Sequence, residues 1–130
     1  MKTETMVKLE RGRALFNAGR YFEAHEVWEE AWLGEEDETR RLLQGLIQVT
    51  AGFHKAFQQR QPKGCVRLLE AGLDKLATAA DDAGDLDLAS FKRAVRSTLE
   101  EARSWERGQS EGLSPDRAPH LDVSKSVKSE

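Results

Sequence analysis

The segment from Thr39 to Gln59 constrains the fold more than any other part of the chain, because its apolar residues recur around most of the circumference of a helix. A helix that is apolar on nearly every side has to be surrounded by other helices. At about 20 residues it is about 30 Å long, the width of a small domain. We therefore expect it to be the central helix of a bundle. Its apolar residues are Leu42, Leu43, Leu46, Ile47, Val49, Phe53 and Phe57.

Four other segments have the apolar spacing or the flanking turn residues of helices. Asn17-Ala18-Gly19 is typical of the end of a first helix, and Pro62 and Gly64 mark the start of the fourth. The predicted fold class is all-α, a compact bundle of about five helices around a central apolar helix. The four flanking helices are expected at about Thr5–Phe16, Arg20–Trp32, Cys65–Ala80 and Leu88–Trp105.

The residues from Gly108 onward differ in composition from the rest of the chain. They are rich in Ser, Gly, Pro and charged residues and contain no aromatic residue. Such a segment buries too little apolar surface to offset the entropy lost on ordering. We expect a helical domain at residues 1–107 and a disordered tail at residues 108–130, with His120 solvated.

The charge balance and hydropathy exclude several classes of partner. The 20 Lys and Arg residues are dispersed among 23 Asp and Glu, which gives a net charge of -3 and no basic footprint for nucleic acid. No stretch approaches the roughly 18 consecutive apolar residues of a membrane-spanning helix, and the first residues lack the apolar core of a secretory signal. We expect a cytoplasmic protein that binds neither nucleic acid nor membranes, and a protein partner or a homo-oligomer fits this composition. The single cysteine, Cys65, is expected to be a small core residue.

The most informative stretch runs from Tyr21 to Trp32. On a helix its aromatic and small residues form an apolar arc about half the circumference wide. His25 and Glu29 fall inside that arc, and Glu26 lies at its boundary. Two ionisable groups in an aromatic arc cost free energy unless they bond to each other or to a partner.

The central helix offers polar partners for this motif. The six-residue connection between the second and third helices favours antiparallel packing, which would bring residues of both together. Gly45 and Gly52 are seven residues apart, so they share a face that another backbone could approach closely. The candidate polar cluster is His25, Glu26, Glu29, Gln48 and His54.

Three interpretations of this cluster stay open, and no catalytic residue can be assigned. The first is a structural network, in which a carboxylate binds His25 and Gln48 satisfies the remaining groups. The second is a divalent metal site with His25, Glu29 and His54 as ligands, since the first two have i, i+4 spacing. The third is metal-free acid–base chemistry by His25 with Glu26 or Glu29. The zinc-protease signature is only partly present, because Glu29 stands where its second histidine would be.

The first hairpin also has features of an interaction module. Across residues 5–38 the small and large residues have the spacing of one tetratricopeptide repeat. The pattern does not recur 34 residues later, and a stable array needs at least three repeats. A repeat solenoid is therefore not expected, and a helical interaction module of one hairpin plus three further helices is an alternative interpretation.

Taken together, residues 16–32, the segment Gln44-Gly45-Leu46-Ile47-Gln48 and His54 resemble the helical family known as domain of unknown function 309. The resemblance covers about residues 7–80. It implies an all-α fold found in bacteria, archaea or plastids, and it brings no established activity, substrate or cofactor. Trp28 and Thr50 depart from the family pattern, where a smaller aliphatic residue and an alanine are expected, and this enlarges the aromatic cluster. The matching motif positions are Tyr21, Glu23, His25, Glu26, Glu29, Trp32, Gly45 and Gln48.

The sequence therefore predicts a helical domain of unknown biochemical function, whose polar cluster is structural or a small binding site. One alternative is a protein-interaction or scaffold module, and another is a metal-dependent hydrolase with a divalent metal as cofactor. An enzyme needs the cluster to line an open pocket, whereas a scaffold needs an exposed apolar patch.

Overall fold

Five α-helices make up the computed structural model, which describes residues 1–125. Two short 3-10 helices, Ala83–Asp85 (η1) and Pro115–Arg117 (η2), lie in the connecting segments. The described residues form no β-strand, and one isolated antiparallel bridge joins Leu86 and Val123. The all-α prediction of about five helices is confirmed. The helices are α1 (Thr3–Asn17), α2 (Tyr21–Leu33), α3 (Asp37–Phe57), α4 (Pro62–Leu76) and α5 (Leu88–Glu106).

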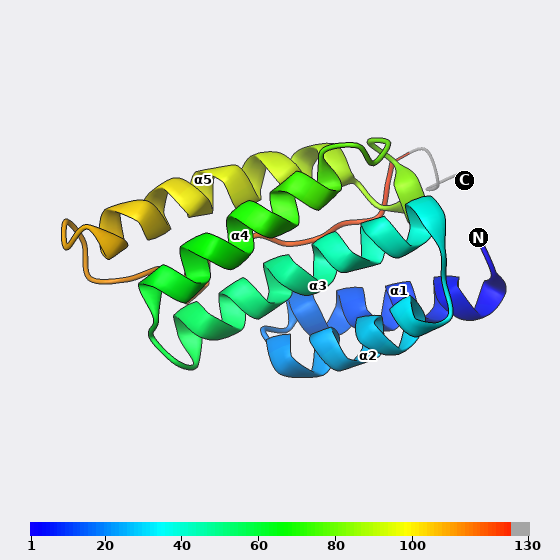
Figure 1. The fold of residues 1–130 in the computed structure, drawn as a ribbon, viewed down its shortest axis with the longest axis horizontal. Helices are drawn as coiled ribbons and strands as arrows, with labels where there is room; N and C mark the ends of the chain where they lie inside the picture. Colours follow the sequence, from blue (N-terminus) through cyan, green and yellow to red (C-terminus); the bar gives the residue numbers. More distant parts are fainter. Residues whose placement is uncertain (126–130) are drawn as a thin grey trace.

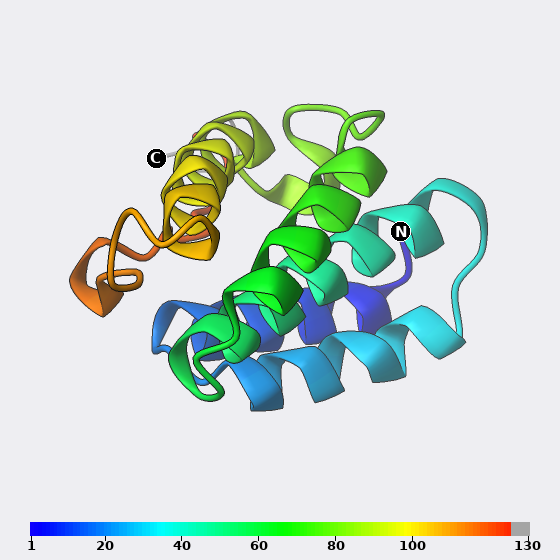
Figure 2. The same ribbon diagram turned by 60° about the vertical axis from the view of Figure 1, so that its left-hand side comes forward.

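Consecutive helices pack against one another, and α3 lies in the middle, between α2 and α4 (Figure 1). The pair α1 and α2 covers one side of α3, and α4 followed by α5 covers the other (Figure 2). Ten residues of α3 are buried, which confirms it as the central helix. Among residues 1–125, none of the helices combines the length and the apolarity that crossing a bilayer requires.

The two glycines on one face of α3 face α4. A Cβ on Gly45 would lie 2.8 Å from the side chain of Leu76 and 3.1 Å from the carbonyl oxygen of Gly72. A Cβ on Gly52 would lie 2.9 Å from the side chain of Leu69. The close backbone approach predicted from their spacing is thus confirmed, and α4 is the helix that uses it.

The core is centred on the buried ring of Phe16 in α1. Its centroid lies 5.2 Å from that of Tyr21 in α2, 5.8 Å from that of Phe53 in α3 and 5.6 Å from that of Phe91 in α5, each in an edge-on arrangement. Edge-on contacts of this kind are favoured by the charge distribution of the rings. One side chain therefore joins α1 to three other helices.

The indole of Trp28 fixes the packing of α1 against α2. Trp28 is fully buried, and its Nε1 donates a hydrogen bond of 3.3 Å to the carbonyl oxygen of Leu9. A Cβ on Gly12 would lie only 2.1 Å from this Nε1. Gly12 therefore provides the space on α1 that the indole occupies.

The segment after α5 lies against the bundle through residue 125, which corrects the prediction of a disordered tail from residue 108 onward. Leu121 in this segment is fully buried. Its N–H donates to the Asn17 Oδ1 at 2.8 Å, and its carbonyl oxygen accepts from the Asn17 Nδ2 at 2.9 Å. His120 is exposed, as predicted. Residues 126–130 of the expected tail lie outside the described residues.

Backbone hydrogen bonds hold the same segment to the start of α5. The Asp87 N–H donates to the carbonyl oxygen of Asp122, and the Ser124 N–H donates to that of Asp85, both at 2.8 Å. Composition predicts disorder from the shortage of apolar residues, but here one leucine and these hydrogen bonds are enough to dock the segment.

We expect Gly12→Ala to destabilise the protein by about 1–3 kcal/mol, because the added methyl group collides with the Trp28 indole. The higher helix propensity of alanine offsets less than about 1 kcal/mol of this cost. Urea unfolding measures the difference. In a Trp28→Val background the same substitution should cost much less, since the three clashing indole atoms, Nε1, Cε2 and Cδ1, are all gone. An equal cost in both backgrounds would contradict this account.

We expect Leu121→Ala to destabilise the protein by about 2 kcal/mol or more, because it opens a cavity beneath the docked C-terminal segment. Thermal unfolding or urea unfolding reports the loss. The matched control is Leu33→Ala, at a leucine that is 70% exposed. A melting temperature that is equally unchanged in both variants would mean that residues 108–125 do not dock in solution.

Candidate functional site

The ring of Phe22 contacts both histidines of the predicted cluster. It is stacked on His25 with a centroid distance of 6.4 Å, and its centroid lies 5.7 Å from that of His54 in a tilted arrangement. The start of α2 packs on the end of α3, where the Tyr21 ring lies 5.8 Å from the Phe57 ring. Antiparallel packing of α2 on α3, predicted from the short connection, is therefore what brings the two histidines to one surface.

The polar contacts of the two histidines are weak. His25 Nε2 lies 4.0 Å from the carboxylate of Glu29, and the His25 side chain is 28% exposed. His54 Nε2 lies 3.5 Å from the side-chain nitrogen of Gln59, at the limit of a hydrogen bond. Each imidazole thus has one long polar contact on its outer side.

Three polar atoms of the cluster are buried without a hydrogen-bond partner among the described residues: His25 Nδ1, His54 Nδ1 and Gln48 Oε1. The structural network expected from the sequence, in which Gln48 satisfies the groups around His25, is not formed. Gln48 stands about two helical turns before His54, on the side of α3 that carries Gly45 and Gly52. Buried polar atoms without partners cost free energy, so this surface is not optimised for stability.

The predicted metal ligands are not gathered into a site. Residues 1–125 contain no group of three His, Cys, Asp or Glu side chains placed to hold a metal ion, so His25, Glu29 and His54 do not form the expected set. Phe22 stands one turn before His25, and its ring packs against both imidazoles. Glu26 is exposed and lines a different groove, between α1 and α2.

The structure offers no activated cysteine to serve acid–base or nucleophilic chemistry. Cys65 is fully buried, and burial raises the pKa of its thiol to about 12. The thiol therefore stays protonated at neutral pH. Its predicted place as a small core residue is confirmed.

A row of exposed residues on the outer face of α2 was missed by the sequence analysis. We call it the α2 strip: Phe22, Glu26, Glu29 and Leu33, which follow i, i+4, i+7, i+11 spacing and are all exposed. Phe22 is 56% exposed and Leu33 is 70% exposed, so the strip has an apolar residue at each end and two carboxylates between. The apolar arc had assigned Phe22 to the buried side. The i, i+4, i+7, i+11 spacing is the signal that could have identified the strip.

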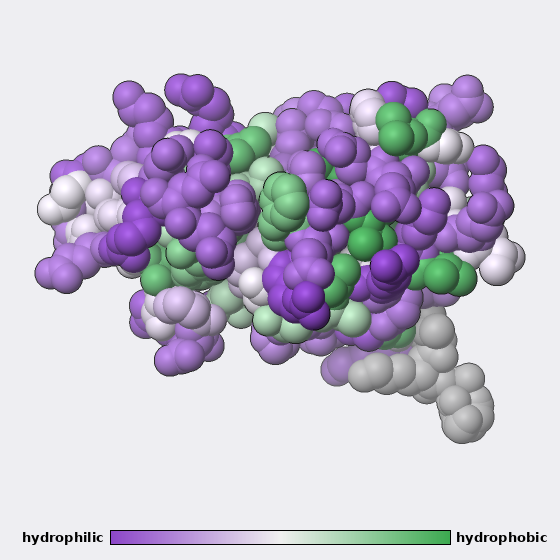
Figure 3. Space-filling view, turned by 90° about the horizontal axis from the view of Figure 1, so that it is seen from below, coloured by the Kyte–Doolittle hydropathy of each residue, from purple (hydrophilic) through white to green (hydrophobic). Residues whose placement is uncertain are grey.

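A groove of about 400 Å³ runs beside the α2 strip, between α1 and α2. Its lining includes the carboxylates of Glu23, Glu26 and Glu30, the apolar side chains of Leu15 and Val27, and one cation, Arg11. Figure 3, which views the α1 and α2 side, shows apolar groups as small patches among hydrophilic ones rather than one continuous patch. The surface on this side of the molecule is therefore acidic and contains small, separate apolar patches.

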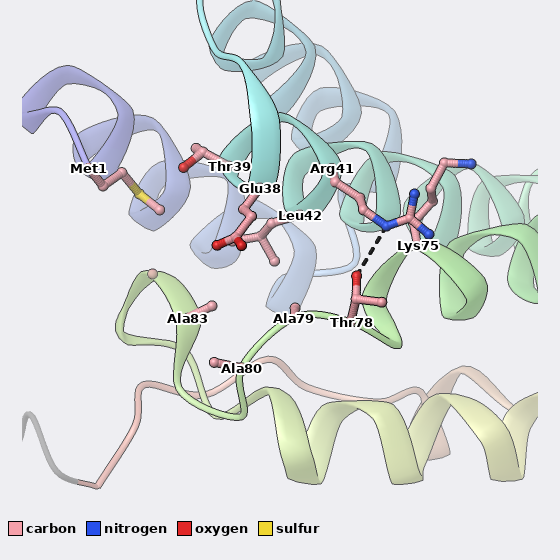
Figure 4. Close-up of a pocket in the computed structure, with 11 residues that line it drawn as sticks. Met1, Glu38, Thr39, Arg41, Leu42, Lys75, Thr78, Ala79, Ala80 and Ala83 are labelled. Carbon is pink, nitrogen blue, oxygen red and sulfur yellow. Dashed lines mark hydrogen bonds between the residues drawn. The ribbon is translucent and has the colours of Figure 1, made fainter.

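A second cavity, of about 370 Å³, lies where the start of α3 meets the end of α4 and η1 (Figure 4). Its lining carries charges of both signs, Glu38 together with Arg41 and Lys75. Arg41 is already engaged, because its Nε donates to the Thr78 hydroxyl at 3.1 Å. The lining therefore does not select a ligand of one charge.

The fold and the surface define a class, a small all-α domain with an aromatic, acidic outer face on its second helix. Residues 9–68 match the family described as "Domain of unknown function (DUF309)", which is the family that the sequence motifs resemble. A relative described as "Uncharacterized protein" in Aquifex aeolicus (strain VF5) is 27% identical over 92 residues. The match covers 70% of this chain and 27% of that protein, and neither comparison supplies a specific function.

We expect His25→Leu to leave stability unchanged or to raise it slightly, by up to about 1 kcal/mol. The substitution removes a buried nitrogen that has no hydrogen-bond partner and keeps apolar contact with Phe22. Urea unfolding at constant slope measures the change. A loss of about 2 kcal/mol or more would show that His25 has a strong partner in solution, and the structural network would return as the better interpretation.

Proposed function

We propose that this chain is a helical protein-interaction module, and that the α2 strip binds a basic, amphipathic segment of a partner protein. The observation that carries the proposal is the exposure of Phe22 and Leu33 at the two ends of a strip whose centre is formed by Glu26 and Glu29. Exposed aromatic residues flanked by polar groups are typical anchors of protein interfaces.

The charge of α2 determines the kind of partner. All of its acidic groups are glutamates, and the helix contains no Lys or Arg. Of these glutamates, Glu23 is paired with Arg20 at 2.5 Å, whereas Glu26 and Glu30 have no cationic partner among the interactions of residues 1–125. Carboxylates spaced along a helix attract lysine and arginine side chains and speed their association.

The surface beside the strip adds two features that suit such a segment. The α1–α2 groove supplies an apolar floor, Leu15 and Val27, between carboxylates. On the other side, His25 and His54 each have an Nε2 atom whose polar contact is long, 4.0 Å to Glu29 and 3.5 Å to Gln59. An arginine or lysine side chain of the partner can donate hydrogen bonds at such positions.

The relative from Aquifex aeolicus supports a modular role, because the matched region makes up 27% of that protein. A second copy of this chain is a poorer occupant of the α2 strip, since a two-fold contact would place Glu26 and Glu29 opposite identical carboxylates. A metal-dependent hydrolase is not proposed, because His25, Glu29 and His54 are not gathered into a metal site. The cytoplasmic location expected from the sequence is part of this proposal.

The proposal is tested with a labelled synthetic peptide that carries leucine on one helical face and lysine on the other. We expect it to bind the intact chain, as measured by fluorescence anisotropy at physiological ionic strength. Phe22→Ala should weaken binding by about tenfold, the equivalent of about 1.4 kcal/mol. The matched apolar control is Val7→Ala on α1, at a valine that is 61% exposed.

Charge variants separate the α2 strip from the general acidity of the chain. Glu26→Gln with Glu29→Gln should weaken binding, whereas Glu106→Gln with Glu111→Gln removes the same charge elsewhere and should leave binding nearly unchanged. If both pairs of substitutions weakened peptide binding equally, the interaction would depend only on the net charge of the chain, and the proposal would be overturned. No binding to the intact chain would overturn it as well.

A further inference from the structure

A cavity of about 660 Å³ lies at the junction of α3 and α4, where α2 contributes none of the lining. Its lining comes from the end of α3, the connecting turn and the first two turns of α4. Four lining side chains are cationic, and none is acidic: Lys55, Arg60, Lys63 and Arg67. The apolar part of the wall includes Leu68. In a chain whose net charge is -3, this concentration of positive charge is a local feature rather than a result of composition.

The four cations have no carboxylate partner among the interactions of residues 1–125. Other arginines of this protein do pair with acids: Arg13 lies 2.9 Å from Glu10, and Arg103 lies 2.8 Å from Glu70. Glu70 stands close to Arg67 on the neighbouring side of α4, but its carboxylate is bonded to Arg103. Lys63 and Arg67 are four residues apart on α4, so they repel each other and destabilise the helix.

Two of the cations are held in place by the surrounding structure. Arg60 has a φ of 50°, donates from Nη2 to the carbonyl oxygen of Glu111 at 2.9 Å and lies 5.6 Å from the centroid of the Trp105 ring. The aliphatic part of Lys55 packs over Gly64, where a Cβ would lie 3.2 Å from the lysine Cδ. The positions of these charges are thus set before any ligand arrives, which lowers the entropy cost of binding.

We propose that this basic pocket binds a small molecule that carries several linked phosphate groups. Four cations without acidic partners supply charge for more than one phosphate, and arginine and lysine are the side chains that bind phosphate oxygens best. The volume exceeds what a single phosphate fills, since ligand pockets of about 300–1,000 Å³ hold drug-sized molecules. Leu68 offers contact to a less polar part of the ligand. The proposal is independent of the α2 strip.

The test is isothermal titration calorimetry of the intact chain with inorganic tripolyphosphate at low ionic strength, and with ATP in a parallel titration without divalent cations. We expect saturable binding that weakens as salt is added, because exposed charges are screened. Similar affinity for both probes assigns the site to the phosphate chain. An affinity for ATP higher by about tenfold or more adds recognition of the nucleoside.

Matched variants locate the site. Lys63→Gln with Arg67→Gln removes two exposed cations of α4 and should weaken tripolyphosphate binding by about tenfold or more. Arg93→Gln with Arg96→Gln removes two exposed cations of α5 and should change it by less than about twofold. Circular dichroism confirms that each variant folds, and Arg60→Gln provides an additional variant from the turn. No saturable binding to the intact chain, or equal weakening by the α4 and α5 pairs, overturns the proposal.

Discussion

Most of the architecture depends on the contacts of one side chain, Phe16. Its ring meets Tyr21, Phe53 and Phe91, so α1, α2, α3 and α5 are positioned by a shared set of edge-on ring contacts. Each such pair contributes about 0.5–1.5 kcal/mol beyond the burial of its area. Because the contacts share one ring, a change at Phe16 affects all of these helices together rather than one pair at a time.

The second helix contributes both a buried core residue and exposed surface residues, and these residues are close together in the sequence. Trp28 is directed into α1 through the space left by Gly12, and this fixes the rotation of α2 about its axis. Once that rotation is fixed, Phe22 and Leu33 have to face outward. The exposed aromatic residue on which the proposed interaction depends is therefore a consequence of how the buried indole is packed.

Periodicity was enough to predict the helices, the central place of α3 and the glycine face that α4 contacts. It was not enough for the site. The apolar arc of α2 spans about half of the helix circumference and includes Phe22, so the sequence pattern assigns Phe22 to the buried side. The packing of Trp28 decides which residues at the border of this arc are exposed. Gln48 and His54 lie on the same helix, but they point in different directions from its axis and therefore face different neighbouring helices. The docked position of Leu121 rests on hydrogen bonds between residues 104 apart, which local composition does not encode.

The contact between Asn17 and Leu121 also sets an order of events during synthesis. The amide of Asn17 belongs to α1, which is synthesised before the rest of this bundle, but its two partners are backbone atoms of Leu121, 104 residues later. Contacts between distant residues form late, because a long loop has to close first. The α1–α2 hairpin can assemble early around Trp28, whereas the end of α1 stays exposed to water until residue 121 has been made. Docking of this segment is thus a late step of folding, in which α1 becomes joined to the residues that follow α5.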